Sequence, residues 1–150
     1  MEIRVAKKED FIFVLDGAKQ FSRLVNRPDI LPHPDSDNFR KAVGDIFMND
    51  FTTVILAMDD GQLLGGIGLM VTPYLWDKSK IACEELFWWV KPGAPNTTAL
   101  RLIKSAKKFA KSSDAEIMSF NSLVSSPEGV GRVYERMGTS LVQHVYAGVI

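Results

Sequence analysis

The chain contains the segment Glu84-Glu85-Leu86-Phe87-Trp88-Trp89-Val90-Lys91-Pro92, followed by a turn of small residues. Its apolar and aromatic centre is typical of a β-strand that is covered on both faces, and we expect this strand over residues 81–90. The segment places a pair of carboxylates at the head of the strand and a run of backbone amides at its foot. A proton acceptor and an anion-binding turn can therefore lie on one short stretch of chain.

The residues after this strand predict a crossover connection. Apolar residues recur at helical spacing between 97 and 111, and the next apolar run, 115–120, has the length of a strand. A strand, a helix and a further strand in this order predict two roughly parallel strands. We expect a last helix over about 127–137, ended by Gly138, and a last strand over 141–150.

The first half of the chain alternates between strand and helix patterns. Its expected elements are a strand over 2–6, a helix from 11 to about 21, a helix capped by Ser36 or Asp37, and a hairpin of strands over 52–58 and 62–72. A proline-containing loop over 26–37 separates the two helices, because proline removes helical hydrogen bonds. The pattern as a whole predicts an α+β domain.

Length and composition restrict the class of protein. The 150 residues fit one domain, 1–150, and 18 basic residues balance 18 acidic ones, which argues against a nucleic-acid clamp. The single cysteine, Cys83, cannot form an internal disulfide, and no cysteine–histidine cluster has the spacing of metal ligands. The chain shows no secretory signal and no run of about 18 apolar residues that could span a bilayer. We therefore expect a cytoplasmic protein with no metal site and no membrane partner.

The order of elements resembles the GNAT superfamily of acyl-coenzyme A N-acyltransferases over nearly the whole chain. Three local matches carry the resemblance: Ile3-Arg4-Val5-Ala6 with Glu9-Asp10, the Val90-Lys91-Pro92 turn into a helix, and Val133-Tyr134-Glu135-Arg136-Met137-Gly138. The third match is the most specific, since it combines a tyrosine, a helix end and a following strand. The resemblance implies a mixed, mainly antiparallel sheet of six to seven strands with helices on both faces.

The resemblance also implies a reaction and its residues. The cofactor is acetyl-coenzyme A, and an amine attacks its thioester directly, with Glu85 as general base and Tyr134 as general acid that protonates the departing sulfur. The implied cofactor-binding residues are Phe87, Trp88, Trp89, Val90, Gly93, Asn96, Thr97, Thr98, Ala99 and Arg101. The first four act through strand amides that hold the thioester and the pantetheine arm. The implied acceptor is an amine of a small molecule or a protein, and the implied assembly is a monomer or a homodimer.

The turn after the strand departs from the family pattern. The family pattern R/Q-x-x-G-x-G/A lets backbone N–H groups approach a pyrophosphate, whereas residues 93–99 lack the arginine and Pro95 supplies no N–H. Thr139 also stands where the family has phenylalanine. An aromatic strand followed by a glycine-poor turn is similar to members found in tailed phages and prophages. The departure motivates the alternative that the chain is a catalytically inactive GNAT-fold module that binds a protein partner.

Each candidate also has a purely structural interpretation. Glu84 and Glu85 fit a solvated strand start, Tyr134 fits a ring that packs the last helix on the sheet, and the strand fits an ordinary fully paired one. Arg101 is the best phosphate candidate on the next helix, whose lysines fit a solvated face or, as a distant third function, a nucleic-acid contact. The structural interpretation is preferred for His33, His144 and Cys83, and Trp76 fits either an acceptor pocket or a loop anchor.

Overall fold

The computed structural model describes residues 1–123, 126 and 128–142. Its elements are β1 (Glu2–Val5), the 3₁₀ turn η1 (Lys8–Asp10), α1 (Phe11–Val25), α2 (Asp37–Phe47), β2 (Thr52–Asp59), β3 (Gln62–Pro73), β4 (Ile81–Val90), α3 (Thr97–Ser112), β5 (Ile117–Ser119) and α4 (Val130–Arg136). The strands form one sheet in the order β1-β2-β3-β4-β5. All neighbours are antiparallel except β4 and β5, which are parallel across the α3 crossover.

These elements confirm the α+β class and the mixed, mainly antiparallel sheet. The described residues contain five strands, fewer than the six to seven expected. The last expected strand, 141–150, lies outside the described residues from 143 onwards, and so does His144. The expected helix over 127–137 is seven residues long in the structure, Val130–Arg136.

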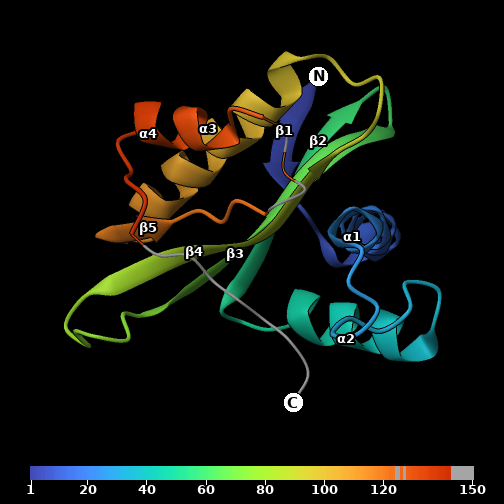
Figure 1. Cartoon of the computed structure of the whole chain (residues 1–150), viewed down its shortest axis with the longest axis horizontal. Helices are drawn as coiled ribbons and strands as arrows, with labels where there is room; N and C mark the ends of the chain where they lie inside the picture. The colour runs from blue at the N-terminus through green and yellow to red at the C-terminus, as the bar shows by residue number, and fades with distance from the viewer. Residues whose placement is uncertain (124–125, 127, 143–150) are drawn as a thin grey trace.

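Helices cover both faces of the sheet, as Figure 1 shows: α1 and α2 lie on one side, and α3 and α4 on the other. One apolar core joins α1 and α2 to the sheet through Val14, Leu15, Phe39, Leu56 and Trp89. The other joins α3 to the opposite face through Ile55, Ile67, Leu69, Leu102 and Ala106. The central strands are therefore buried on both sides, which explains their almost uninterrupted apolar sequence.

Local sequence explains the turns and caps. The Ser36 hydroxyl accepts the Phe39 N–H at 3.2 Å and caps α2, as expected. The β2–β3 hairpin closes through Asp60 and Gly61, which both have positive φ angles, 46° and 76°. That pair of angles is the one a two-residue type I′ turn requires, and glycine adopts it without strain.

A partly buried ion pair joins β1 to the start of α1. The Arg4 guanidinium donates to both carboxylate oxygens of Asp10, at 2.6 and 2.9 Å, and the Lys7 N–H donates to Asp10 as well, at 2.7 Å. The paired arginine lowers the pKa of Asp10 from 3.8 to about 2. Asp10 therefore fixes the start of the first helix relative to β1.

Glycines make room for the two aromatic rings of β4 that face α1. A Cβ at Gly17 of α1 would lie 1.8 Å from Trp89 Cζ2, and a Cβ at Gly66 of β3 would lie 2.5 Å from the same ring. A Cβ at Gly68 would lie 2.7 Å from the ring of Phe87. No larger residue fits these positions unless β4 moves, so the glycines set how closely β4 packs against α1.

None of the described helices is both long and apolar enough to cross a lipid bilayer.

Candidate active site

A β-bulge in β4 sets the direction of the candidate base. Leu69 of β3 pairs with Glu85 and Gly68 pairs with Phe87, so Leu86 has no partner on β3. Strict alternation along the strand would place Glu85 on the same face as Phe87 and Trp89, and the structure places it on the other face. The rings of Phe87 and Trp89 stack at 5.7 Å on the α1 side, whereas Glu85 lies on the α4 side with Trp88. The extra residue reverses the alternation, as a bulge does.

The sheet splits beside this bulge. The β4–β5 ladder consists of Ala82, Cys83 and Glu84 opposite residues 117–119, and it ends there. The Lys91 N–H donates to Leu64 O on β3 at 2.8 Å, so in the alternating ladder Trp88 and Val90 direct their N–H and C=O groups away from β3. Two backbone amides of β4 thus face the gap beyond the end of the β5 ladder, in the part of the strand that the sequence assigned to the cofactor.

Glu85 is buried at this split, with 2% of its surface exposed. Its Oε2 accepts the backbone N–H of Asn121 at 2.7 Å, and its carbonyl oxygen accepts the Asn121 side-chain amide. Burial raises the pKa of Glu85 from 4.5 to about 7, and the Asn121 N–H offsets part of that rise. A carboxyl group with this pKa exchanges protons readily at neutral pH.

Tyr134 of α4 reaches the same point from the other side of the gap. Its hydroxyl donates to Asn121 O at 3.1 Å and accepts the Trp88 indole N–H at 2.9 Å. Its ring stacks on Phe120 with centroids 4.8 Å apart. Burial, followed by the charge of Glu85, raises the pKa of Tyr134, while the Trp88 hydrogen bond lowers it. The phenol is therefore protonated at neutral pH.

The turn between β4 and α3 is largely exposed, and only some of its predicted phosphate ligands are accessible. Gly93 has a φ of 83°, and no heavy atom lies within 4 Å of where its Cβ would stand. Asn96 and Thr97 are exposed at the start of α3, and Ala99 is partly buried. These residues leave the helix N-terminus open to an anion.

Two of the predicted phosphate ligands are engaged elsewhere. Thr98 is fully buried, its N–H donates to Pro95 O at 2.8 Å, and its hydroxyl donates to Met1 Sδ at 3.5 Å. Arg101 is exposed, and its guanidinium donates to Met1 O at 3.2 Å. Both contacts tie the start of α3 to the N-terminus of the chain, so a phosphate group would have to compete for Arg101.

Cys83 and His33 take the structural roles that were preferred for them. Cys83 is fully buried, and burial raises the pKa of its thiol to about 11. His33 is exposed and its Nδ1 accepts the Asp35 N–H at 3.2 Å. Trp76 is 82% exposed in the β3–β4 loop. The Lys107 ammonium donates to the Met137 carbonyl at the end of α4, which the sequence did not predict. No group of three or more histidine, cysteine, aspartate or glutamate side chains suited to a metal occurs among the described residues.

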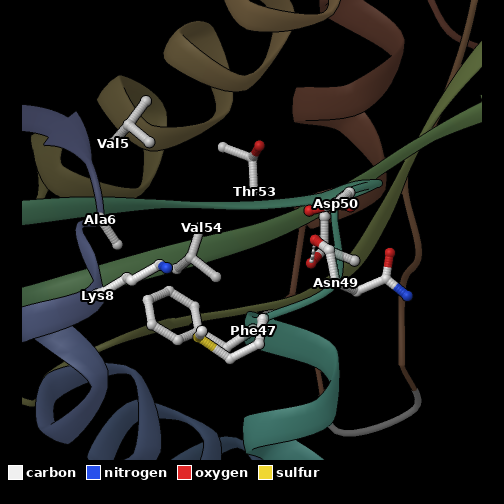
Figure 2. Close-up of a pocket in the computed structure, with 10 residues that line it drawn as sticks. Val5, Ala6, Lys8, Phe47, Asn49, Asp50, Thr53 and Val54 are labelled. Carbon is white, nitrogen blue, oxygen red and sulfur yellow. Dashed lines mark hydrogen bonds between the residues drawn. The ribbon is translucent and has the colours of Figure 1, made fainter.

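Two surface hollows lie away from this cluster. One, of about 340 Å³, lies between the ends of β1, α2 and β2, where Lys8, Phe47 and Val54 line it, as Figure 2 shows. The other, of about 510 Å³, lies at the opposite end of the edge strand β1, between Met1, Arg4 and Gly61. Neither of these two hollows includes Glu85 or Tyr134.

Sequence reasoning missed two residues of this cluster. Asn121 bonds both to Glu85 and to Tyr134, and the only sequence signal for it is a polar residue directly after the predicted strand 115–120. The side chain of Trp88 was assigned no role, because sequence alone cannot pair it with a tyrosine 46 positions later. The cluster is thus assembled by the crossover, which brings α4 back over β4.

Comparison with known proteins identifies the fold. No family model and no curated protein matches the chain. Solved structures do match. A probable acetyltransferase has a TM-score of 0.77 and 21% sequence identity, and the match covers 100% of this chain and 97% of that one. The ribosomal-protein-alanine N-acetyltransferase of Brucella melitensis has a TM-score of 0.74 and 14% identity, and the match covers 100% of both chains. A predicted acetyltransferase of Clostridium acetobutylicum, solved with acetyl-CoA, is also similar, with a TM-score of 0.69 and 16% identity over 97% of this chain and 94% of that one. These likenesses confirm the GNAT-like fold.

Proposed function

We propose that this chain is an N-acetyltransferase that transfers an acetyl group from acetyl-coenzyme A to a primary amine by direct attack. The observation that carries the proposal is the meeting of Glu85 and Tyr134 at Asn121, beside the point where β4 leaves β5. One of these groups titrates near neutral pH and the other stays protonated, which is the pair that amine acylation needs. The similar fold of solved acetyltransferases supports the same conclusion.

Glu85 is the proposed general base. An amine becomes acidic as it attacks a carbonyl carbon, and a carboxylate within hydrogen-bond reach, or one water away, takes up the proton. With a pKa raised to about 7, Glu85 is a stronger base than an exposed glutamate, yet about half of it is still ionised at pH 7. The alternative base, Glu84, pairs with Met70 of β3 and Ser119 of β5 within the ladder and is only partly buried.

Tyr134 is the proposed general acid, and its acidity is coupled to the state of Glu85. The Glu85 charge is one of the causes that raise the pKa of Tyr134. When Glu85 takes up the amine proton that charge disappears, so the phenol becomes more acidic at the stage when the C–S bond breaks. The Tyr134 proton then goes to the departing sulfur, and solvent restores the phenol and the Glu85 carboxylate.

The residues of the split and the turn fit acetyl-coenzyme A as donor. The amides of Trp88 and Val90 face the gap and can bind the thioester oxygen and the pantetheine amides; one such preorganised donor can be worth about 3 kcal/mol in an acyl transfer. Gly93, Asn96, Thr97 and Ala99 surround the open N-terminus of α3, where a pyrophosphate would bind. When bound, the cofactor supplies an activated acetyl thioester; this chain supplies orientation and proton transfer.

The proposal extends to the surroundings of the reaction. The acceptor is the amine of a small molecule or a protein, approaching past the loop between α1 and α2. Asp35 anchors that loop, since it accepts from Lys19 Nζ at 2.8 Å and from Arg23 at 3.2 Å. The reducing cytoplasm suits a chain whose one thiol is free and buried.

A thermal-shift titration with acetyl-coenzyme A tests the proposal. A ligand at 100 times its dissociation constant adds about 2.7 kcal/mol to the stability of a one-site protein, so we expect a clear rise in melting temperature. Release of the free thiol in the presence of a panel of amines then measures turnover. An unchanged melting temperature at millimolar acetyl-coenzyme A would refute the proposed enzymatic function.

One observation favours a second candidate, a catalytically inactive module that binds a protein partner. Pro95 lacks an N–H, Thr98 is buried and Arg101 is bonded to Met1, so the turn offers few ready phosphate donors. This candidate predicts no stabilisation by acetyl-coenzyme A and no thiol release with any amine. The same titration therefore separates the two functions.

A further inference from the structure

The side chain of Trp88 is bonded to the proposed acid. Its indole Nε1 lies 2.9 Å from the Tyr134 hydroxyl oxygen. An indole N–H can only donate, so the phenol oxygen must be the acceptor. The phenol therefore cannot direct its own proton at Trp88, and that proton points instead to Asn121 O, 3.1 Å away.

Trp88 is itself held in place. Its ring packs against the buried cluster of Ile103, Val130 and Tyr134, which joins α3 and α4 above the split. Trp88 faces this cluster because regular alternation places it opposite its neighbours Phe87 and Trp89, which face α1. The donor is thus fixed by packing on one side and by the strand on the other.

We propose that Trp88 is a positioning residue for Tyr134: its indole N–H fixes the phenol with its proton on Asn121 O, beside the split, and stabilises the phenolate that remains after the proton has been given to the departing sulfur. This role belongs to the side chain and is separate from the role proposed for the Trp88 backbone amide. The inference rests on the proposed function, because it assigns how the proposed acid works.

The physical reason is that the hydrogen bond strengthens as charge develops. A bond to a neutral oxygen contributes less than a bond to an ionised one, and the difference, of the order of a factor of ten in an equilibrium, lowers the free energy of the phenolate state. The direction agrees with the lowering effect of Trp88 on the Tyr134 pKa. Removal of the N–H should therefore slow proton donation and leave cofactor binding unchanged.

The other two tryptophans serve as internal controls. Trp76 is 82% exposed in the loop between β3 and β4. Trp89 is buried on the opposite face, and its Nε1 has no hydrogen-bond partner among the described residues. A proton–nitrogen correlation spectrum of the unliganded protein should therefore show three different indole environments, and Trp88→Phe and Trp76→Phe assign two of the signals.

The first experiment tests the hydrogen bond without any turnover. In Tyr134→Phe, which keeps the ring and removes the hydroxyl, the Trp88 indole proton should move upfield and exchange faster with solvent, while the signals of Trp76 and Trp89 stay in place. An unchanged Trp88 signal would overturn the inference whether or not the protein is an acetyltransferase. The readout is thus independent of the proposed function.

The second experiment is a double-mutant cycle in turnover. Trp88→Phe should lower kcat about tenfold and change the KM for acetyl-coenzyme A by less than about twofold. In the Tyr134→Phe background the same substitution should change kcat by less than about twofold, because the group through which it acts is gone.

The outcomes separate the possibilities. Equal losses of kcat in both backgrounds would mean that Trp88 only packs, and the positioning role would be overturned. A wild-type protein that binds no acetyl-coenzyme A and turns over no amine would overturn the proposed function and the positioning role together, while the indole signal would still report the hydrogen bond. A loss of kcat on Trp88→Phe when Tyr134 is present, and none in the Tyr134→Phe background, supports the proposal.

Discussion

Replacing Glu85 with glutamine should stabilise the protein at neutral and alkaline pH. Glu85 is 2% exposed, and an isolated buried carboxylate loses hydration that the Asn121 N–H only partly replaces. Glutamine has nearly the same shape and keeps a carbonyl oxygen that can accept the Asn121 N–H, but it carries no charge. The substitution therefore removes the cost of burying the charge and little else.

The magnitude follows from the pKa of Glu85. Its ordinary value is 4.5 and its folded value is about 7, so the difference is about 2.5 units, which corresponds to about 3 kcal/mol. Because the folded pKa is the higher one, the folded state binds the proton more tightly than the unfolded state. The wild type therefore has this stability below about pH 4.5 and loses it as the pH rises through 7. Glu85→Gln has no such loss.

Urea unfolding at two pH values measures the effect. At about pH 8 the unfolding free energy of Glu85→Gln should exceed that of the wild type by about 3 kcal/mol, and at about pH 4 the two should agree. Glu84→Gln is the matched control, since it makes the same change at the neighbouring, partly exposed residue and should stay within about 0.5 kcal/mol of the wild type. A stability difference that is the same at both pH values would refute the burial argument. If Glu85 is the base, the stabilised variant should also lose about 10²- to 10⁴-fold in kcat.

Three further outcomes are expected. The kcat/KM of the wild type should rise with pH to a plateau, with a midpoint near 7, because the Glu85 carboxylate must be ionised to act; a midpoint near 4.5 in stopped-flow thiol release would contradict this. Asp10→Asn should lower the unfolding free energy at pH 7 by about 2 kcal/mol, which is the equivalent of a pKa lowered from 3.8 to about 2. The wild type should lose the same amount as the pH falls from about 4 to about 2. Equal urea midpoints of the two proteins at pH 7 would show that the Arg4–Asp10 pair contributes nothing to stability. Gly17→Ala should lower the unfolding free energy by about 1–3 kcal/mol or more, because its Cβ would overlap the Trp89 ring. Gly44→Ala, where the nearest atom is 3.8 Å away, should raise it by about 0.5–1 kcal/mol through helix propensity. Melting-temperature shifts of the same sign in the two variants would contradict this reasoning.

Sequence periodicity predicts the elements of this fold well, because each depends mainly on local properties. The strand Ile81–Val90 has the predicted limits, and Ser36 caps α2 as its hydroxyl and position suggest. The hairpin through Asp60 and Gly61 follows from the ability of these residues to take positive φ angles. None of these features needs a distant partner.

The candidate site is less predictable, because its geometry depends on partners far along the chain. The position of Thr98 at a helix start suggests an accessible hydroxyl. In the structure the start of α3 packs on Met1, and the hydroxyl faces Met1 Sδ. Asn121 has no recognisable motif, and its contacts arise only when β5 and α4 are placed beside β4. Sequence reasoning named Glu85 and Tyr134 from a resemblance, and it had no means of finding the residue to which both are bonded.

The bulge at Leu86 has a local sequence signal and also determines contacts with distant residues. Three glycines within four residues of β3, Gly65, Gly66 and Gly68, are an uncommon composition for a strand interior, and such glycines mark bulges or close backbone approach. A Cβ at Gly66 or Gly68 would overlap the ring of Trp89 or Phe87, so these two glycines let the rings pack closely against β3. With those two side chains fixed on the α1 face, the residue inserted at Leu86 is what turns Glu85 back toward α4 and joins it to Asn121.

The same bulge explains how one strand serves as core and as candidate site. Before it, Ala82, Cys83 and Glu84 pair with β5 and hold the sheet together. After it, the amides of Trp88 and Val90 face the gap, while the rings of Phe21, Phe87 and Trp89 pack together on the α1 side. The tight packing of Trp89 between Gly17 and Gly66 holds β4 in this position from the α1 side. The glycines on one face of β4 are therefore a condition for the opening on the other, which predicts that Gly17→Ala should weaken acetyl-coenzyme A binding although Gly17 is on the opposite face from Tyr134.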